Sequence, residues 1–564
     1  MSKKIFIPIT IIILLNIPAY AQSLHSKGIS LDGSIGSAGK LELQGPDFDI
    51  KAEYGKQSGT NLFHSFEKFN LHSGESATFS GPDTVNNIIS RVTGGESSWI
   101  DGAIKSTIPD ANFYFLNPSG VMFGPNSSLD IGGSFHVSTA NYLKLGENET
   151  FYSDIFSTSE LTSSSPTAFG FLTDQISSIT IDGKGEIFIN NSDDLPTTGL
   201  VVKNGKTLSL IGGEINIKNE TFVKIKDTIY DYEGQPHEYD VSRKLGTLTA
   251  PQGEINLISF VSKGEVNIFD TEVDLSLLNQ YGNITISDKS LLDVSGEGAG
   301  SIFMCGKNIL IRDSAIQADT YGRDNGGMVN ISAENISFLD GSRISLITYG
   351  SGSGCALNIN ALKDILFSVD KENHEHPGNY IFSQNKEEMS YFQNVPLPNF
   401  SGGIVSISAS IANNGGNSGN ISIYGENIFL SNGARIIGST YGDGKGSDIK
   451  VIALETINFF GSNFNNDFSG IIIETHSKDL NAGCAGNIMI NANNIILNNG
   501  AGIEGFTFGH GNSGSIKMYA KNKISFIGNS KDLYVLLLLK MMKYFGEGNE
   551  EFFGGGVFVG KCSF

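Results

Sequence analysis

Short runs of alternating apolar and polar residues, most of them preceded by glycine, recur along the second half of the chain. Three examples are Gly300-Ser-Ile-Phe-Met, Gly327-Met-Val-Asn-Ile and Gly354-Cys-Ala-Leu-Asn-Ile. Alternation with a period of two is typical of a β-strand that buries one face. The glycines at 300, 327 and 354 lie 27 residues apart, so the strands belong to a repeat.

One repeat, which begins at Gly327, contains three strand-like stretches separated by polar turns. The stretches are Met328–Ser332, Asn335–Leu339 and Arg343–Thr348. Three strands and three turns in about 27 residues predict one coil of a parallel β-helix. A single coil cannot bury its inward Ile and Val side chains, whereas stacked coils form a continuous apolar interior. If residues 25–525 all follow this pattern, they form about 20 coils and a rod roughly 95 Å long.

The composition supports a folded β protein and excludes some classes of partner. The 564 residues include 69 glycines, only 14 prolines and 39% hydrophobic residues, which fits many short strands and turns rather than disorder. The formal net charge of −21 makes nucleic acid an unsuitable partner, because the chain repels phosphate groups. The four cysteines, at positions 305, 355, 484 and 562, are too sparse for a disulfide framework, although one disulfide remains open.

The first 21 residues have the features of a signal peptide. A basic start at Lys3 and an apolar stretch over residues 5–17 precede the A-x-A cleavage site of Ala19 and Ala21, so we expect the mature chain to begin at Gln22. The apolar stretch is too short to span a bilayer, and a retained N-terminal anchor is the alternative. We therefore expect export through the periplasm to the cell surface, the outer membrane or the medium.

Residues 24–145 carry a set of motifs that differ from the later repeats. In chain order they include Asn61-Leu-Phe63-His-Ser-Phe66-Glu-Lys-Phe69, Asn87-Ile-Ile-Ser-Arg91-Val and Asn117-Pro118-Ser119-Gly120-Val-Met-Phe. Together they resemble the N-terminal haemagglutination activity domain of the filamentous haemagglutinin family, the TpsA exoproteins of two-partner secretion. The chain has Ser119 where the family has Asn in its Asn-Pro-Asn-Gly-Ile motif, and it has no Asn-Pro-Asn-Leu motif, which leaves the subfamily open.

The resemblance implies a fold, a partner and a set of recognition residues. The fold is an all-β, single-stranded right-handed parallel β-helix, a solenoid with a capped N-terminal secretion domain. The partner is a TpsB-type outer-membrane transporter, which would recognise the domain in the periplasm while it is unfolded or nearly so. The residues expected to carry this recognition are Asn61, Phe63, Phe66, Phe69, Asn87, Arg91, Asn117, Pro118, Ser119 and Gly120.

The same residues also have structural interpretations. Phe63, Phe66 and Phe69 are candidates for stacked core positions. Residues 117–120 have the pattern of a tight turn, with Pro at the second and Gly at the fourth position. Arg91 either pairs with a nearby acid or faces the transporter, and the sequence does not separate these two interpretations.

Breaks in the pattern indicate five segments. The last of them lacks the alternation and favours helix locally, which suggests a truncation or a reading-frame change, with a native amphipathic cap as the alternative. The segments are a signal peptide (1–21), the secretion domain (22–150), a β-helix continuation (151–280) with an insertion at 227–241, β-helix repeats (281–528) with an insertion at 368–402, and a C-terminal segment (529–564).

These features favour a secreted, adhesin-like or haemagglutinin-like surface protein without an active site, metal or cofactor. Its further partner would be a receptor or glycan on a host or neighbouring cell. A secreted β-helical carbohydrate-active enzyme, a lyase or hydrolase, is the alternative. Hydrolysis needs two carboxylates at a set separation, and Asp193-Asp194 has the features of a turn instead. His374 and His376 lack an evident third metal ligand.

Overall fold

The computed structural model of the chain describes most residues from 26 to 527 and one strand near the C-terminus. Strands dominate this part of the chain, and the short 3-10 helix η1 (Ala52–Tyr54) interrupts them. Within it, no helix is long and apolar enough to cross a membrane. The described residues are 26–189, 199–218, 221–230, 236–245, 247–268, 280–369, 401–410, 414–463, 467–477, 480–508, 510–527 and 557–561.

A coil of the rod consists of three strands, as the repeat predicts. In the coil that follows Gly327 the strands are β32 (Met328–Ala333), β33 (Asn335–Leu339) and β34 (Arg343–Thr348). Each pairs in parallel with the equivalent strand of the next coil. The prediction of a parallel β-helix is confirmed, and the predicted bounds of these strands differ from the observed ones by a single residue, Ala333.

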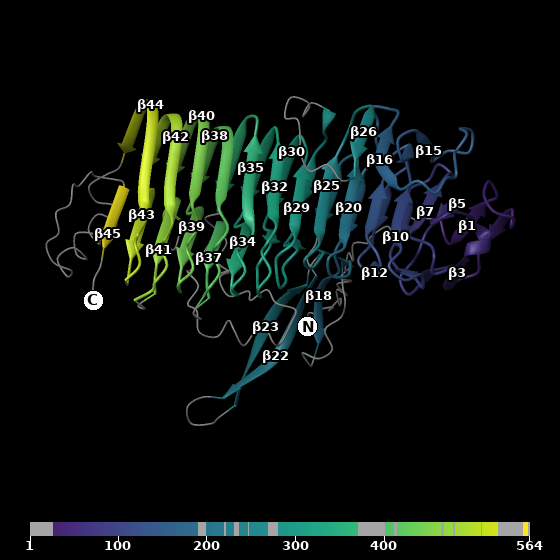
Figure 1. Cartoon of the computed structure of the whole chain (residues 1–564), viewed down its shortest axis with the longest axis horizontal. Helices are drawn as coiled ribbons and strands as arrows, with labels where there is room; N and C mark the ends of the chain where they lie inside the picture. The colour runs from purple at the N-terminus through teal and green to yellow at the C-terminus, as the bar shows by residue number, and fades with distance from the viewer. Residues whose placement is uncertain are drawn as a thin grey trace, which may run out of the picture.

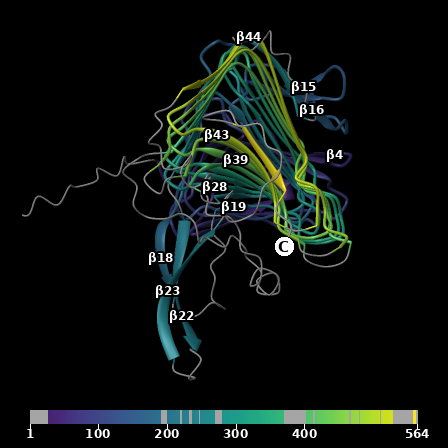
Figure 2. The same ribbon diagram turned by 90° about the vertical axis from the view of Figure 1, so that its left-hand side faces the viewer.

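The coils stack into a long rod (Figure 1), and the rod has a triangular outline when viewed along its axis (Figure 2). Two of its three faces belong to one continuous sheet of 24 strands, because in the later coils a single bulged strand continues around the corner. The strands of this sheet are β1 (Ile29–Asp32), β2 (Lys40–Glu42), β4 (Lys56–Ser58), β5 (Asn61–Phe69), β7 (Asn87–Val92), β8 (Ser98–Ile100), β10 (Asn112–Leu116), β11 (Val121–Phe123), β13 (Phe135–Ser138), β17 (Ile179–Asp182), β20 (Thr207–Gly212), β21 (Ile215–Lys218), β25 (Glu254–Ser259), β27 (Ile284–Ile286), β29 (Ser301–Cys305), β30 (Asn308–Arg312), β32, β33, β35 (Ala356–Ala361), β36 (Asp364–Ser368), β38 (Ile421–Ser431), β40 (Ile449–Phe460), β42 (Asn487–Asn498) and β44 (Ser515–Ile527).

The third face is formed by a four-stranded sheet and a ten-stranded sheet, which meet between β12 and β19. The expectation of about 20 coils is too high, because two parts of the chain leave the rod, as described below. The strands of the third face are β3 (Asp47–Lys51), β6 (Ser76–Ser80), β9 (Ala103–Ser106), β12 (Ser128–Asp130), β19 (Leu200–Val201), β24 (Leu248–Thr249), β28 (Leu291–Asp293), β31 (Ala315–Gln317), β34, β37 (Gly403–Ser408), β39 (Arg435–Thr440), β41 (Gly470–Thr475), β43 (Gly502–Thr507) and β45 (Val557–Lys561).

Antiparallel strands close the N-terminal end of the rod. β1 pairs with β2 and with β5 in antiparallel orientation, and β4 pairs with β5 in the same way. β5 also begins the parallel ladder, because it pairs in parallel with β7. These strands cover the first coil, so its edge is not open to pairing with another chain. The predicted N-terminal cap is thereby confirmed.

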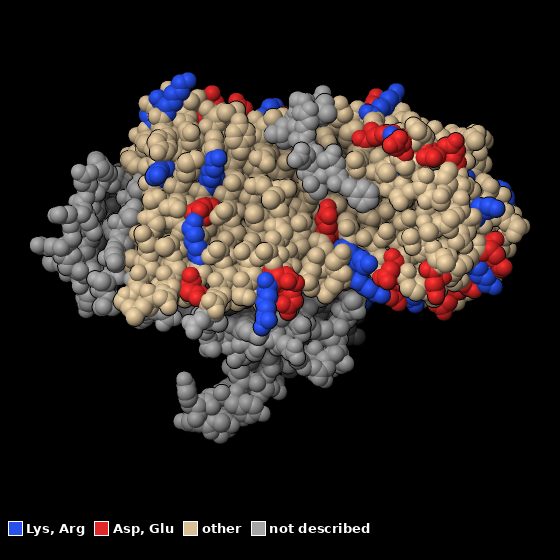
Figure 3. All heavy atoms as spheres, viewed as in Figure 1, with Lys and Arg blue, Asp and Glu red and all other residues tan. Residues whose placement is uncertain are grey.

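The outer surface of the rod beyond residue 280 carries ladders of uncharged polar side chains. Asn308 donates its side-chain amide to Asn283 (2.8 Å), and Asn335 donates to Asn308 (2.9 Å) on the next coil. In the view of Figure 3, few Lys, Arg, Asp or Glu side chains of the described residues lie over the middle of the rod. Hydrogen bonds between coils therefore hold these amide groups in place.

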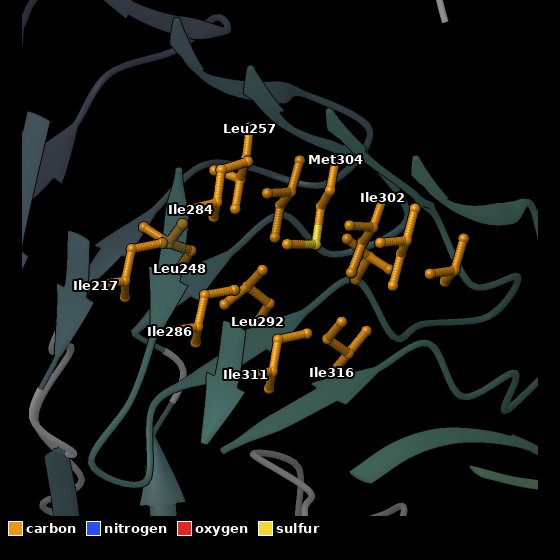
Figure 4. Close-up of a cluster of buried hydrophobic side chains, with 14 of the residues drawn as sticks. Ile217, Leu248, Leu257, Ile284, Ile286, Leu292, Ile302, Met304, Ile311 and Ile316 are labelled. Carbon is orange, nitrogen blue, oxygen red and sulfur yellow. The ribbon is translucent and has the colours of Figure 1, made fainter. Parts of the chain in front are cut away.

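The interior of the rod is a continuous column of apolar side chains. Ile217, Ile286 and Ile311 stack on successive coils in strict register (Figure 4). Nearer the N-terminus the column is aromatic, and the rings of Phe79 and Phe113 meet edge to face with centroids 4.7 Å apart. The inward half of each alternating run thus fills the core, as the period of two requires.

Glycines stand where successive coils touch through their backbones. A Cβ on Gly419 would overlap the carbonyl oxygen of Cys355, and a Cβ on Gly514 would overlap that of Gly486. Both Gly419 and Gly514 are the glycines that precede repeat strands in the sequence. The repeat therefore needs glycine there because the backbones approach too closely for any side chain.

Two elements leave the rod. The first, here called the outer sheet, is antiparallel and contains β14 (Tyr142–Leu145), β15 (Glu149–Tyr152), β16 (Pro166–Phe171) and β26 (Gly264–Asn267). The second is a hairpin that projects from the rod (Figure 1), in which β22 (Thr221–Tyr230) pairs with β23 (Pro236–Leu245) and with β18 (Gly185–Ile189). The insertion expected at 227–241 lies within this hairpin.

Several sequence predictions fall outside the described residues. Of the C-terminal segment, only β45 is described, and it extends the third face as a parallel partner of β43. Cys305, Cys355 and Cys484 are free thiols, so no disulfide joins the three described cysteines. The predictions outside the described residues are the signal peptide with Ala19, Ala21 and Gln22, the turn at Asp193-Asp194, His374 and His376, and most of the insertion at 368–402.

Candidate functional site

The outer sheet covers one face of the rod and creates a second apolar core. Phe63 from β5 and Phe151 from β15 are fully buried in it, with ring centroids 5.1 Å apart. Phe66 and Phe69, by contrast, lie in the interior column. All three phenylalanines are buried as expected, but Phe63 occupies a different core, because alternation along β5 turns it toward the outside of the rod.

The second core ends abruptly along the rod. Cys305 on β29 is buried beneath the outer sheet, and its register partner on the next coil is Ser332. Phe303, on the same strand, is also buried, and its register partner on the next coil is Asn330. The outward face thus changes from apolar to polar within one coil, so the outer sheet and the coils up to residue 305 form one packed unit.

A buried arginine joins the cap, the rod and the outer sheet. Arg91 on β7 is 3% exposed, and its guanidinium donates to the hydroxyls of Ser65 (2.7 Å) and Ser34 (2.9 Å). It also donates to the backbone carbonyls of Tyr152 (2.6 Å) and Asp154 (3.1 Å). These partners come from β5, from the loop after β1 and from the end of β15, so one side chain fixes three elements.

Asp32 supplies the negative charge of this network. Its carboxylate accepts hydrogen bonds from the hydroxyls of Ser65 (2.5 Å), Ser34 (2.7 Å) and Thr93 (2.7 Å). Burial acts to raise the pKa of Asp32, but these donors outweigh it and hold the pKa below its usual value. Burial lowers the pKa of Arg91, and the charge of Asp32 opposes this shift. In the folded domain Arg91 thus lies near an acid, and its contact with the transporter stays a prediction.

An asparagine ladder ties the loop before β16 to the rod. Asn87 donates its side-chain amide to Asn61 (2.8 Å), and Asn112 donates to Asn87 (3.3 Å) on successive coils. The Asn61 amide in turn donates to the backbone carbonyls of Thr162 (2.9 Å) and Ser164 (2.8 Å). Because these amides have hydrogen-bond partners, their burial does not destabilise the domain.

The turn predicted at residues 117–120 is formed. The Gly120 N–H donates to the Asn117 carbonyl (3.0 Å), and the Ser119 N–H donates to the Asn117 side-chain oxygen (3.0 Å). Asn117 is fully buried and donates its own amide to the Ser98 hydroxyl (3.0 Å). Ser119 takes part through its backbone, a contact that the family's asparagine would make equally well.

Most of the predicted recognition residues lie inside the folded domain. Pro118 and Ser119 are half-buried. The structure brings Asn61 and Asn87 together. The ten predicted residues as a group, however, are distributed over the interior column, the second core and the polar contacts. They therefore do not form one surface that a partner could contact on the folded domain. Their role in recognition stays a prediction. The buried members are Asn61, Phe63, Phe66, Phe69, Asn87, Arg91, Asn117 and Gly120.

The residue pattern alone did not indicate Asp32, Ser34 and Ser65 as partners of Arg91. One signal for Ser65 was available, because Asn61 and Asn87 are 26 residues apart and so are Ser65 and Arg91. Both pairs are register partners on β5 and β7. No comparable spacing marks Asp32, which belongs to the antiparallel cap.

Two buried histidines of the same region are uncharged. His64 is fully buried, and neither ring nitrogen has a hydrogen-bond partner. His136 is 3% exposed and shares a hydrogen bond with the Ser209 hydroxyl (3.0 Å). Burial lowers the pKa of each imidazole to about 3. Neither histidine is therefore available for acid–base chemistry near neutral pH.

We expect His64→Leu to make the stability of the protein less sensitive to acid. The folded state keeps His64 neutral, whereas the unfolded chain takes up a proton below pH ~6.5, so the wild type loses stability as the pH falls through that value. Between about pH 7.5 and 5.5 this loss is about 1.4 kcal/mol for one histidine. Urea unfolding at both pH values measures it. An equal pH dependence in wild type and variant would contradict the prediction.

Residues 28–304 match the family described as TPS secretion domain. The chain therefore carries the N-terminal secretion domain of the TpsA exoproteins of two-partner secretion. In this TpsA protein the match begins beside β1 and ends in β29, one residue before the last residue of the second core, Cys305. It therefore extends beyond residue 150 and includes the outer sheet and the projecting hairpin.

One solved structure similar to this TpsA protein is the HMW1 secretion domain from Haemophilus influenzae. The two chains are 14% identical, the similarity covers 86% of this chain and 98% of that chain, and the TM-score is 0.36. No curated protein sequence matches the chain.

The family identifies the route of export. A TPS secretion domain implies a TpsB transporter in the outer membrane as the partner of the chain. The TpsA protein is accordingly secreted across the outer membrane. The unit closed by the cap and by the outer sheet is the part of the molecule that this family defines.

Proposed function

We propose that the TpsA protein is a non-enzymatic, adhesin-like exoprotein whose rod displays binding surfaces. The observation that carries the proposal is the unbroken interior column, which runs from Ile29 in the cap to Ile503 on β43. Coils that share one core and one hydrogen-bond ladder form a rigid body with a large outer surface for its volume. Such a shape suits the presentation of contacts to another cell.

The surface chemistry supports the same proposal. On the outer surface beyond residue 280, the hydrogen-bonded row of Asn283, Asn308 and Asn335 holds amide groups in fixed places on successive coils. Amides are both donors and acceptors, so they suit ligands that are recognised through hydrogen bonds, such as glycans and protein receptors. A surface with ordered polar groups also keeps a long β-rod from pairing with copies of itself.

The enzymatic alternative has one observation in its favour. Asp293 and Asp319 lie on neighbouring coils of the third face, and burial, with a contribution from Asp293, raises the pKa of Asp319 to about 7. A carboxyl group with such a pKa is typical of a general acid. However, Asp319 is 3% exposed and accepts hydrogen bonds from the Ser345 hydroxyl (2.8 Å) and the Ile347 N–H (2.7 Å). These contacts favour a structural role.

Adhesion of cells that secrete the protein tests the proposal. Cells that produce the TpsA protein with its transporter should adhere to target cells, or to one another, several-fold better than cells without it. A variant with Asp293→Asn and Asp319→Asn should adhere as well as the wild type. Adhesion that does not depend on the protein would contradict the proposal. So would cleavage of a polysaccharide by the purified protein that is lost in the double variant.

A further inference from the structure

Tyr142 of the outer sheet lies flat across a glycine on the neighbouring strand. The strands of this sheet follow the order β15, β14, β16, β26, and Tyr142 on β14 is the register partner of Gly170 on β16. A Cβ at Gly170 would overlap three carbons of the Tyr142 ring. The ring therefore covers the backbone of Gly170, and glycine is the residue that permits this position.

Two contacts hold the ring and its neighbour in place. The Tyr142 hydroxyl donates to one carboxylate oxygen of Glu265 (2.9 Å), and the Lys144 ammonium donates to the other (2.9 Å). Glu265 on β26 is the register partner of Gly170 on β16. The side chains of Tyr142 and Lys144 on β14 therefore reach across β16 to contact it. The hydrogen bond from Lys144 is the main cause that lowers the pKa of Glu265. Lys144 and Glu265 thus form an ion pair whose net charge is zero.

A second aromatic ring borders the first. The ring of Tyr152 on β15 lies 5.7 Å from that of Tyr142, with an angle of 55° between the planes. Both tyrosines are on the outward side of the sheet, because their neighbours Leu143 and Phe151 are fully buried beneath it. Figures 1 and 2 agree that β15 and β16 lie on the outside of the rod.

We propose that this aromatic shelf, defined as Tyr142, Tyr152, Lys144 and Glu265, binds a neutral saccharide. The C–H groups on one face of a sugar ring pack against a flat aromatic ring, and hydroxyls at the rim of the sugar need both donors and acceptors. Lys144 and Glu265 supply these at the edge of the Tyr142 ring and are 28% and 40% exposed. Because their charges cancel, the shelf favours a neutral sugar over a charged one.

The shelf suits a saccharide better than an apolar peptide or a lipid. Each of those ligands needs a concave apolar site, whereas the Tyr142 ring is supported from below by Gly170 and bordered by an ion pair. The biological use of this site rests on the adhesive function proposed above. The binding itself is a separate property of the secretion domain and is measured separately.

Saturation-transfer NMR on the purified secreted protein tests the inference. The probes are the methyl glycosides of glucose, galactose and mannose, and N-acetylglucosamine. We expect transfer to the ring C–H groups of at least one probe, with binding about tenfold weaker in Tyr142→Ala and in Gly170→Ala. The second variant keeps every aromatic ring and only displaces Tyr142. Tyr519→Ala is the matched control, because Tyr519 is 55% exposed on β44, away from the outer sheet.

Two results would overturn the inference: no transfer to any of the four probes, or transfer that survives both substitutions at the shelf. Thermal unfolding of each variant verifies that the fold is retained. The adhesion assay separates this inference from the proposed function. Adhesion that persists when saccharide binding is lost supports the shelf as a site distinct from the adhesive surface. Adhesion by a protein that binds none of the probes leaves the adhesive function intact and contradicts the shelf.

Discussion

Arg91→Ala is expected to destabilise the secretion domain by about 3–5 kcal/mol. The substitution leaves the Asp32 carboxylate without its nearby cation and the carbonyls of Tyr152 and Asp154 without their charged donor. Since the guanidinium connects the cap to the outer sheet, both elements should loosen in the same transition. Trp99 on β8 is the single tryptophan of the chain, so its fluorescence during urea unfolding reports on this domain.

Arg323→Ala is the matched control for this experiment. Arg323 is exposed on the rod beyond the secretion domain, and its loss should change the free energy of unfolding by less than about 0.5 kcal/mol. Equal urea midpoints for the two variants would mean that the buried network contributes little and that the second core alone holds the outer sheet.

Gly419→Ala is expected to destabilise the middle of the rod by about 3 kcal/mol. The new methyl group would overlap the Cys355 carbonyl on the preceding coil, so β38 has to move away from β35 and lose their shared hydrogen bonds. In a solenoid each coil contacts only its neighbours, which confines the damage to these strands. Hydrogen exchange measured by mass spectrometry should therefore rise in β35 and β38 but not around Trp99.

Gly505→Ala provides a control of the same chemistry. An added Cβ at Gly505 meets no atom closer than 3.5 Å, so the neighbouring strands need not move. Faster exchange of similar extent in both variants would contradict the explanation by backbone contact. It would point instead to a general intolerance of side chains at these glycines.

The sequence predicted the coil well because period and alternation encode it directly. The three strands of the coil after Gly327 are predicted to within one residue, and the turn at Asn117 follows from the chemistry of Pro and Gly. The same reasoning could not separate the two cores. Leu62, Phe63 and Phe66 are all apolar, so their pattern does not indicate which of them face a second layer outside the rod.

The polar network around Arg91 lay beyond sequence reasoning for a different reason. Asp32 is 59 residues away along the chain and belongs to an antiparallel strand that does not follow the coil spacing. The carbonyls of Tyr152 and Asp154 are backbone groups, which every residue has, so the residue types at these positions do not indicate the contact. Predicting this contact requires knowing that the chain leaves the rod after residue 141 and returns over β7.

The switch from Phe303 to Asn330 has a consequence for how such molecules are assembled. A segment that follows residue 305 adds nothing to the second core, because the outward positions that continue Phe303 and Cys305 are the polar residues Asn330 and Ser332. It has to supply strands of matching register and inward apolar side chains that continue the interior column. The length, the charge and the ligand of the segment after residue 305 can then vary without disturbing the secretion domain that directs export through the outer membrane.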